Sequence, residues 1–262
     1  MYYIDKQREV IQMLTQERYA VILKLLEQKK TITVSELTKA LNSSESTIRR
    51  DLVALNSIGK LNKVHGGATE LDASYSTKDD DVSIRQSRNI EEKHAIGKYA
   101  ASLIENDDFV YIDAGTTTEI MIDYITRENA VYVTNSTVHA KKLAQKGCRV
   151  FILGGELKMA TDAVVGNEAI ESLKKYNFTK GFFGTNGVNI KTGYTTPDVS
   201  EALVKTDALS KCNVKFVLAD TTKFNSISPI TFARLNAASI ITTVIDDIQY
   251  KNYTTIMETE KR

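Results

Sequence analysis

From about residue 90 to its end, the chain alternates short apolar runs with stretches of helical periodicity, and this alternation restricts the fold more than any other feature. The strand-like runs are Phe109–Asp113, Val131–Asn135, Val150–Leu153, Gly181–Gly184, Lys215–Asp220 and Ile240–Ile245. Helical stretches fall at about 90–104, 119–125, 138–145, 168–176 and 199–209. Strands and helices that alternate at this spacing predict an α/β domain with a mainly parallel sheet.

The first part of the chain shows a different pattern, that of three short helices followed by two short strands. Thr33 and Glu36 fit a capping box at the start of the second helix, and Ser44 can cap the third. The predicted helices span about 16–28, 33–41 and 44–57, and the predicted strands span 60–64 and 68–71. Three helices and a hairpin predict a winged helix-turn-helix module.

The third predicted helix carries the side chains that a DNA-reading helix needs. Ile48, Leu52 and Leu55 form one buried stripe, which leaves hydroxyls and arginines on the opposite face. The major groove of DNA is about 12 Å wide and admits one helix, whose first turns can reach base edges and phosphates. An isolated pair of arginines would more simply be a solvated face, but the surrounding helix-turn-helix pattern favours DNA. The predicted DNA-binding residues are Ser44, Ser46, Thr47, Arg49, Arg50, Lys63 and His65.

Charge is divided unequally between the two parts of the chain, although the formal net charge of the whole is only +1. Residues 1–68 hold 11 Lys and Arg against 7 Asp and Glu, a net charge of +4. Residues 69–262 hold 23 against 26, a net charge of −3. The basic charge therefore gathers on the predicted DNA-binding module. Because it is modest, one copy would bind DNA weakly, and we expect a homo-oligomer, either a dimer or a tetramer.

The ends of the predicted parallel strands are rich in small and polar residues. In open parallel sheets, ligands bind outside the carboxyl ends of the strands. Asp113 is followed by Gly115 and three threonines at a helix start, where backbone N–H groups and hydroxyls favour an anion. We therefore expect a phosphorylated, polyhydroxylated effector. The predicted effector-binding residues are Asp113, Gly115, Thr116, Thr117, Thr118, Asn135, Gly154, Gly155, Thr185, Asn186, Gly187, Asp198, Glu201, Lys205 and Lys223.

Several segments together resemble the DeoR-type bacterial transcriptional regulators, and the resemblance runs over nearly the whole chain. The segments are Thr33–Leu37, Ser44–Leu52, His65–Ala68 and, in the sensor domain of that family, Asp113–Thr118. Within the family, two further motifs are most similar to the fructose operon repressors. These are Gly184–Gly187 and Thr195–Asp198.

The resemblance implies a transcriptional repressor of a sugar-utilisation operon, for which fructose is the expected sugar. It implies binding to double-stranded operator DNA under the control of a phosphorylated sugar, with fructose 1-phosphate as the expected effector. It also implies that the α/β sensor domain resembles the fold of ribose-5-phosphate isomerase and the sugar-phosphate deaminases. An activator is an alternative to a repressor, and a DNA-binding protein without any effector is another.

A sugar-phosphate isomerase fused to a DNA-binding domain is a further alternative. The acid-rich catalytic loop of those enzymes corresponds here to Gly184–Gly187, which has no carboxylate, so we expect ligand binding without catalysis. Asp198, Glu201 and Lys205 lie at i, i+3 and i+7 of one helix and could hold a sugar, or form an ordinary ion network on the helix surface. His139 is expected to be structural rather than catalytic.

The predicted domains are a winged helix-turn-helix domain at 13–71, a linker at 72–89 and a sensor domain at 90–262. Residues 1–12 are either an extension or the product of a start site assigned too far upstream. No apolar run reaches the roughly 18–20 residues that cross a bilayer, so we expect a cytoplasmic protein without a membrane partner. We expect no metal and no cofactor, since no Cys or His cluster and no dinucleotide or Walker motif occurs. Cys148 and Cys212 are expected to be reduced, buried thiols.

Overall fold

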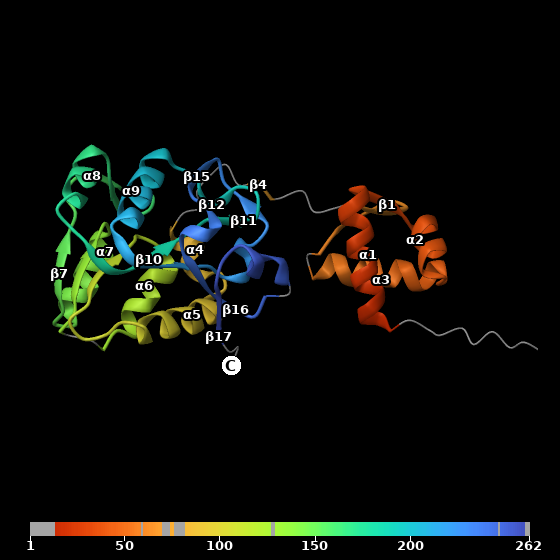
Figure 1. Cartoon of the computed structure of the whole chain (residues 1–262), viewed down its shortest axis with the longest axis horizontal. Helices are drawn as coiled ribbons and strands as arrows, with labels where there is room; N and C mark the ends of the chain where they lie inside the picture. Colours follow the sequence, from red (N-terminus) through yellow and green to blue (C-terminus); the bar gives the residue numbers. More distant parts are fainter. Residues whose placement is uncertain are drawn as a thin grey trace, which may run out of the picture. The chain divides into compact units, whose positions relative to one another are not determined.

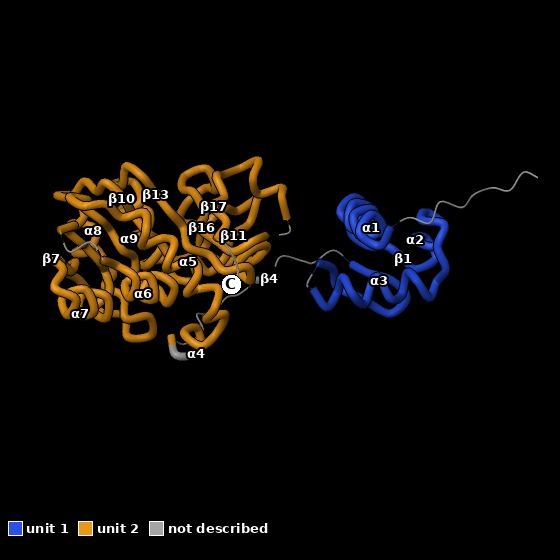
Figure 2. Tube along the Cα trace, turned by 90° about the horizontal axis from the view of Figure 1, so that it is seen from below, with its two compact units in different colours: residues 1–72 blue, residues 73–262 orange. Residues whose placement is uncertain are grey.

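The chain forms two compact units, residues 1–72 and residues 73–262, which Figure 2 distinguishes by colour. The computed structural model describes residues 14–58, 60–69, 74–75, 82–126, 129–245 and 247–259. The predicted extension at 1–12 lies outside the described residues, as do residues 72–73 and 76–81 of the predicted linker. In the described part of the chain, no helix is long and apolar enough to cross a membrane.

Unit 1 contains three helices and a small antiparallel sheet (Figure 1). Its elements are α1 (Thr15–Lys29), β1 (Thr31–Thr33), α2 (Val34–Leu41), α3 (Glu45–Ser57), β2 (Asn62–Val64) and β3 (Gly67–Thr69). The two predicted caps are present: the Glu36 N–H donates to Thr33 Oγ1 at 3.2 Å, and the Thr47 N–H donates to Ser44 Oγ at 3.3 Å. The predicted winged helix-turn-helix module is therefore confirmed.

Strand β1 is an addition to the predicted pattern, because three residues are too few to show any periodicity. It pairs with β3, and β3 pairs with β2, so the sheet has the order β1-β3-β2. The core of unit 1 is formed by apolar side chains from all three helices and this sheet. Its members include Ile22, Leu26, Ile32, Leu37, Ile48, Leu52, Leu55 and Ala68.

Unit 2 is built on a seven-stranded sheet in which every strand pair is parallel, in the order β17-β16-β13-β10-β5-β6-β7. The strands are β5 (Phe109–Ile112), β6 (Val131–Thr134), β7 (Arg149–Ile152), β10 (Phe178–Gly184), β13 (Cys212–Leu218), β16 (Ser239–Thr243) and β17 (Ile256–Thr259). The first six confirm the predicted strands and the α/β fold. The seventh, β17, was not predicted, because only Ile256 and Met257 of its four residues are apolar.

Helices cover both faces of this sheet (Figure 1). One apolar cluster joins α5 (Ile90–Ser102), α6 (Thr116–Asp123) and α7 (Thr137–Gln145) to side chains such as Val110 and Ile112 of β5. A second cluster joins α8 (Asn167–Leu173) and α9 (Val199–Ser210) to side chains such as Tyr111 of the same strand. Consecutive residues of β5 thus point to opposite faces, as the strand geometry requires.

The order of the strands creates a topological switch point between β5 and β10. From β5 the chain continues to β6 and β7 on one side, whereas from β10 it continues to β13, β16 and β17 on the other. Crossover connections therefore leave the two central strands in opposite directions and open a crevice at their carboxyl ends.

Shorter elements surround the sheet, and two of them fall within the predicted linker. They are β4 (Ser74–Tyr75), α4 (Val82–Ser87), β8 (Glu156–Lys158), β9 (Ala163–Val165), β11 (Gly187–Asn189), β12 (Gly193–Thr196), β14 (Ser226–Ile227) and β15 (Ile230–Ala233). Strand β4 pairs with β14, and α4 packs against α6. Residues 74–75 and 82–87 are therefore regular structure of unit 2 rather than linker. The polar sequence of these residues did not predict β4 and α4. Both elements are held by contacts with distant segments, and neither has an apolar periodicity of its own.

Candidate effector pocket and DNA-reading face

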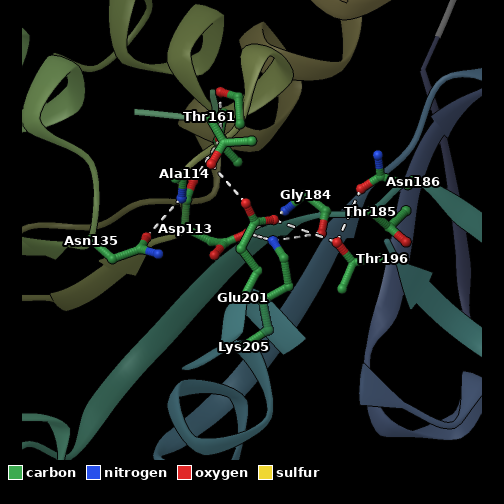
Figure 3. A network of polar contacts seen from close by, with 12 residues as sticks. Asp113, Ala114, Asn135, Thr161, Gly184, Thr185, Asn186, Thr196, Glu201 and Lys205 are labelled. Atoms are coloured by element: carbon green, nitrogen blue, oxygen red, sulfur yellow. Dashed lines mark hydrogen bonds and ion pairs between the residues drawn. The ribbon is translucent and has the colours of Figure 1, made fainter. Parts of the chain in front are cut away.

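A polar pocket lies at the carboxyl ends of β5 and β10, at the switch point of the sheet. Asp113 directly follows β5, Gly184 ends β10, and Glu201 and Lys205 reach the same place from α9 (Figure 3). Because these elements belong to the packed sheet and its covering helices, the side chains are held on a rigid frame. The pocket therefore has the position at which open parallel sheets bind ligands.

A buried ion pair forms the floor of the pocket. The Lys205 ammonium donates to Asp113 Oδ2, which also accepts the Gly184 N–H at 3.1 Å. Asp113 is fully buried and Lys205 is 5% exposed. Burial raises the pKa of the Asp113 carboxyl, and the neighbouring Lys205 ammonium opposes that rise. The other carboxylate oxygen, Oδ1, is buried but accepts no hydrogen bond from any described residue.

Glu201 forms a second buried polar centre beside this pair. Its Oε1 accepts hydrogen bonds from Thr161 Oγ1 at 2.7 Å and from Lys158 Nζ at 2.9 Å. Glu201 is only 8% exposed, so Glu201 and Lys205 do not form the exposed helix-surface network that the sequence left open. Asp198 does take part in an ordinary contact, since it caps α9 and pairs with Lys158 at 3.2 Å.

The first turn of α6 supplies the part of the pocket that suits an anion. Gly115 is its N-cap residue and provides no side-chain cap, and Thr116 and Thr117 line the pocket. The unpaired N–H groups at such a helix start favour a phosphate. His139 lies beneath this turn: its Nε2–H donates to the Gly115 carbonyl at 3.2 Å, and burial lowers its pKa to about 3. His139 is thus neutral; it also lines the pocket, and its Nδ1 has no partner among the described residues.

Four cationic side chains line another part of the pocket: Arg85, Arg88, Lys93 and Lys223. Lys93 is 3% exposed, and its ammonium donates to the backbone carbonyl of Arg85. Burial lowers the pKa of Lys93 to about 8, Asp220 opposes this, and the other three cations add to it. Lys223, Arg85 and Arg88 are therefore close enough to Lys93 to act on its ammonium.

The structure brings most of the predicted effector-binding residues together in this pocket. Those that line it are Asp113, Gly115, Thr116, Thr117, Asn135, Thr185, Asn186, Glu201, Lys205 and Lys223. Several of them are engaged within the protein as well: for example, Asn135 Oδ1 accepts the Ala114 N–H at 2.8 Å. The predicted set is thus largely one spatial cluster.

Five predicted residues lie outside the pocket lining, each for a local reason. Thr118 donates its hydroxyl to the carbonyls of Asp113 and Gly115, at 2.7 and 2.9 Å, and so holds the turn instead of facing a ligand. Gly154 and Gly155 form the turn between β7 and β8, where a Cβ on Gly155 would lie 2.6 Å from the Val165 carbonyl oxygen. Gly187 pairs with β12, and Asp198 caps α9.

The pocket also contains residues outside the predicted effector-binding set. They include Arg85, Arg88, Asn89, Lys93, Thr161 and Asp220. The first three lie in the predicted linker, and Lys93 follows within the next helix, so no strand end marked them. Asp220 closes one of the predicted strands, and this position was the available signal for it.

The predicted DNA-binding residues lie together on the surface of unit 1. Arg49 and Arg50 are exposed on α3, as are Lys63 and His65 on the wing formed by β2, β3 and their turn. The hydroxyls of Ser46 and Thr47 each lie 2.9 Å from Ser44 Oγ at the start of α3. Arg49 pairs with Glu45 at 3.2 Å, and this exposed pair is weak enough to exchange for a base.

A buried ion pair lies behind this face and was not predicted. Arg18 of α1 donates to both carboxylate oxygens of Asp51 on α3, Nε to Oδ2 at 2.8 Å and Nη2 to Oδ1 at 3.1 Å. Asp51 points away from the exposed arginines and is 4% exposed. The pair joins α1 to α3 and adds to the core contacts of Ile48, Leu52 and Leu55 on α3.

Two family models match the chain: a DeoR-like helix-turn-helix domain over residues 18–73 and a DeoR C-terminal sensor domain over residues 88–246. The chain is 41% identical over 242 residues to the HTH-type transcriptional regulator FruR of Bacillus subtilis, across 92% of this chain and 96% of that protein. It is 36% identical over 234 residues to a lactose phosphotransferase system repressor of Staphylococcus aureus, across 88% and 92%. Ribose 5-phosphate isomerase A of Methanocaldococcus jannaschii aligns over 52% of this chain and 55% of its own, with 16% identity and a TM-score of 0.38.

Proposed function

Because this chain belongs to the DeoR family of transcriptional regulators, we propose that it is a cytoplasmic repressor of a sugar-utilisation operon. Unit 1 binds double-stranded operator DNA, and unit 2 binds a phosphorylated sugar that controls this binding. The relatives named as a transcriptional regulator and as a sugar-system repressor support this assignment. The modest charge of the DNA-binding module supports action as a homo-oligomer, either a dimer or a tetramer.

The proposal that unit 1 binds DNA rests on the capped helix α3, which exposes hydroxyls and two arginines beside a basic wing. Arg49 has the length and the planar donor geometry to bind a guanine edge. Arg50, Lys63 and His65 would then contact phosphates, which position the protein without reading sequence.

The effector half rests on the pocket at the switch point. The floor of the pocket offers a carboxylate, an ammonium and hydroxyls, which match the hydroxyls of a sugar, and the start of α6 suits a phosphate. Motifs that resemble those of the fructose operon repressors, Gly184–Gly187 and Thr195–Asp198, make fructose 1-phosphate the first ligand to test. No cofactor or metal enters this proposal.

We further propose that the pocket binds its ligand without converting it. An isomerase needs a positioned general base that takes a proton from the sugar. Asp113 is instead ion-paired with Lys205, and Glu201 accepts from Thr161 and Lys158. Incubation with pentose and hexose phosphates should give no product, and turnover would establish the isomerase alternative.

The DNA assignment is tested by two substitutions with different expected effects. Arg49→Ala should weaken operator binding by roughly 1–3 kcal/mol and relax specificity at one base pair. Lys63→Ala should weaken binding to all sequences alike and lower the slope of log affinity against log salt by about 1. If both variants bind like the wild-type protein, α3 and the wing do not form the DNA-binding face.

The effector assignment is tested by thermal shift and calorimetry with sugar phosphates, starting with fructose 1-phosphate. Lys205→Met should abolish ligand binding while operator binding is retained, and Lys98→Met on the exposed surface of α5 serves as the matched control. Transcription from the target promoter in vitro should rise when the ligand is added to the repressed template. A fall would identify an activator, and the absence of binding by any sugar phosphate would overturn the sensor assignment.

A further inference from the structure

The strand at one edge of the large sheet of unit 2 is both apolar and exposed. Strand β7 ends the strand order, so no described strand pairs with its outer side (Figure 1). Phe151 is 39% exposed and Ile152 is 45% exposed, whereas the neighbouring strand β6 is buried from Tyr132 to Thr134. An exposed, apolar edge strand is a site to which another strand can add.

Strand β7 has none of the usual devices that keep an edge from pairing, apart from one charge. Proteins protect exposed edges with charged side chains, prolines or bulges. The one charged residue of β7 is Arg149 at its start, and its guanidinium lies 5.4 Å from the centre of the Phe151 ring. The strand contains no proline, and its pairing with β6 has no register shift. The edge is therefore regular along its length.

The hydrogen bonds with β6 show which backbone groups of β7 face outward. The Leu153 N–H donates to the Thr134 carbonyl at 3.0 Å, on the side of β6. Backbone N–H and C=O groups alternate in direction from one residue of a strand to the next. The backbone groups of Val150 and Ile152 therefore face the open side of β7, and those of Phe151 face β6.

These outward groups match an antiparallel copy of the same strand. If Val150 of one copy lies opposite Ile152 of the other, each of the two symmetric pairs exchanges two hydrogen bonds. Phe151 then lies opposite Phe151 of the second copy, on the two-fold axis, in a pair without hydrogen bonds where side chains approach closely. Arg149 lies opposite Leu153, so no like charges meet. All three apolar residues of β7 are paired with apolar residues in this register.

We infer that two copies of this chain associate through β7 in this register, so that their sheets continue into one another across a two-fold axis. The inference rests on the proposed function, because it assigns the surface at which the proposed homo-oligomer forms. A two-fold contact must be complementary to itself, and the backbone and side chains of β7 meet this condition. A second copy is therefore the partner that this edge fits.

The pairing strand is joined to the effector pocket by a short stretch of chain. After β7 the chain turns through Gly154 and Gly155 into β8. Thr161 and Asp162, which connect β8 to β9, line the pocket. A ligand in the pocket would therefore lie against the segment that follows the pairing strand.

The first test places a cysteine on the two-fold axis of the full-length protein. In Phe151→Cys the two new thiols should form a disulfide on mild oxidation, because Cβ atoms that lie opposite each other in such a pair are about 4.5–5.5 Å apart. Arg149→Cys is the matched control: in the same register its two Cα atoms are four residues apart along the strands, roughly 13 Å, and cannot be bridged. The wild-type protein, whose Cys148 and Cys212 are buried, controls for the native thiols.

The second test removes an outward N–H and measures association by sedimentation equilibrium over a range of protein concentrations. Ile152→Pro removes this donor from both copies, and proline is tolerated where the lost N–H faces away from the sheet. Two hydrogen bonds are lost per dimer, so the dissociation constant should rise by roughly 10- to 100-fold. Ile152→Val keeps the N–H and an apolar, β-branched side chain, and it should associate like the wild-type protein.

The inference requires both results. If the wild-type protein is a tetramer, Ile152→Pro should give dimers rather than monomers, since a second interface remains. If the wild-type protein associates but Phe151→Cys is cross-linked no more than Arg149→Cys, or Ile152→Pro associates like Ile152→Val, the inference is wrong and the proposed homo-oligomer is intact. If the wild-type protein is a monomer at every concentration, the proposed homo-oligomer fails, and the inference fails with it.

Discussion

The buried pair between Arg18 and Asp51 gives a prediction whose size follows from the structure. Asp51→Ala removes the carboxylate that forms two hydrogen bonds with a guanidinium that is only 8% exposed. Breaking a buried ion pair in this way costs roughly 3–5 kcal/mol. A small domain has a total stability of only about 5–15 kcal/mol, so unit 1 should lose a large part of its stability.

Native-state hydrogen exchange on the full-length chain measures this loss where it occurs. The slowest amides of α3 exchange through unfolding of unit 1, and their opening free energy should fall by about 3–5 kcal/mol. The amides of the central strands of unit 2 provide the internal reference and should be unchanged. Operator affinity should fall in parallel, although Asp51 does not face the exposed side of α3.

The matched control replaces both partners at once. Arg18→Met combined with Asp51→Leu substitutes apolar side chains of similar size for the pair, and such exchanges are often neutral or stabilising. The double variant should therefore recover most of the stability and the operator binding. The reasoning is refuted if Asp51→Ala costs less than about 1 kcal/mol, or if the double variant is as unstable as the single one.

Three further predictions concern separate parts of the chain. Gly67→Ala should destabilise unit 1 by roughly 1–3 kcal/mol in urea unfolding, because the added Cβ would lie 2.2 Å from the Ile32 carbonyl oxygen. If the variant is as stable as the wild-type protein, Gly67 and Ile32 do not approach each other this closely. Thr33→Ala should cost about 1 kcal/mol by removing the cap of α2, and an unchanged urea midpoint would contradict it. The pKa of His139 is lowered to about 3, so unit 2 should be stable above pH 6.5 and lose up to about 1.4 kcal/mol per unit as the pH falls toward 3. Replacing His139 by Gln should remove that part of the slope.

The fold was predictable where a segment carries its own periodicity. Strands β5, β6, β10, β13 and β16 lie inside the sheet, and their apolar runs report burial; the edge strand β7 also carries an apolar run, although its residues are mostly exposed. The antiparallel strands β11, β12 and β15, and the short β1 and β17, were not predictable in this way. Each is a few residues long and exists because a distant strand or helix packs against it.

The residues of the candidate site also fall into those that a local sequence pattern predicts and those that only the packing of distant segments brings together. Asp113 and Lys205 could be predicted, because Asp113 ends a predicted strand and Lys205 lies at helical spacing from Asp198 and Glu201. Thr118 was assigned to the ligand because sequence alone does not show which of three consecutive hydroxyls turns inward to the backbone. Arg85 and Lys93 were missed because their convergence depends on the packing of α4 against α6, which no local pattern reports.

The attachment of the wing has a consequence for the length of DNA that one copy can recognise. Strand β1 pairs with β3 beside the turn of the wing, the Val34 N–H donates to the Gly66 carbonyl at 2.9 Å, and the Lys63 N–H donates to Asn56 of α3 at 2.8 Å. The wing is thus fastened both to the start of α2 and to the end of the reading helix. The separation between the bases under α3 and the backbone under the wing is then a fixed length, so one base pair inserted inside a half-site should abolish recognition. Any tolerance to spacing must arise between half-sites, where separate copies of the protein meet the same duplex.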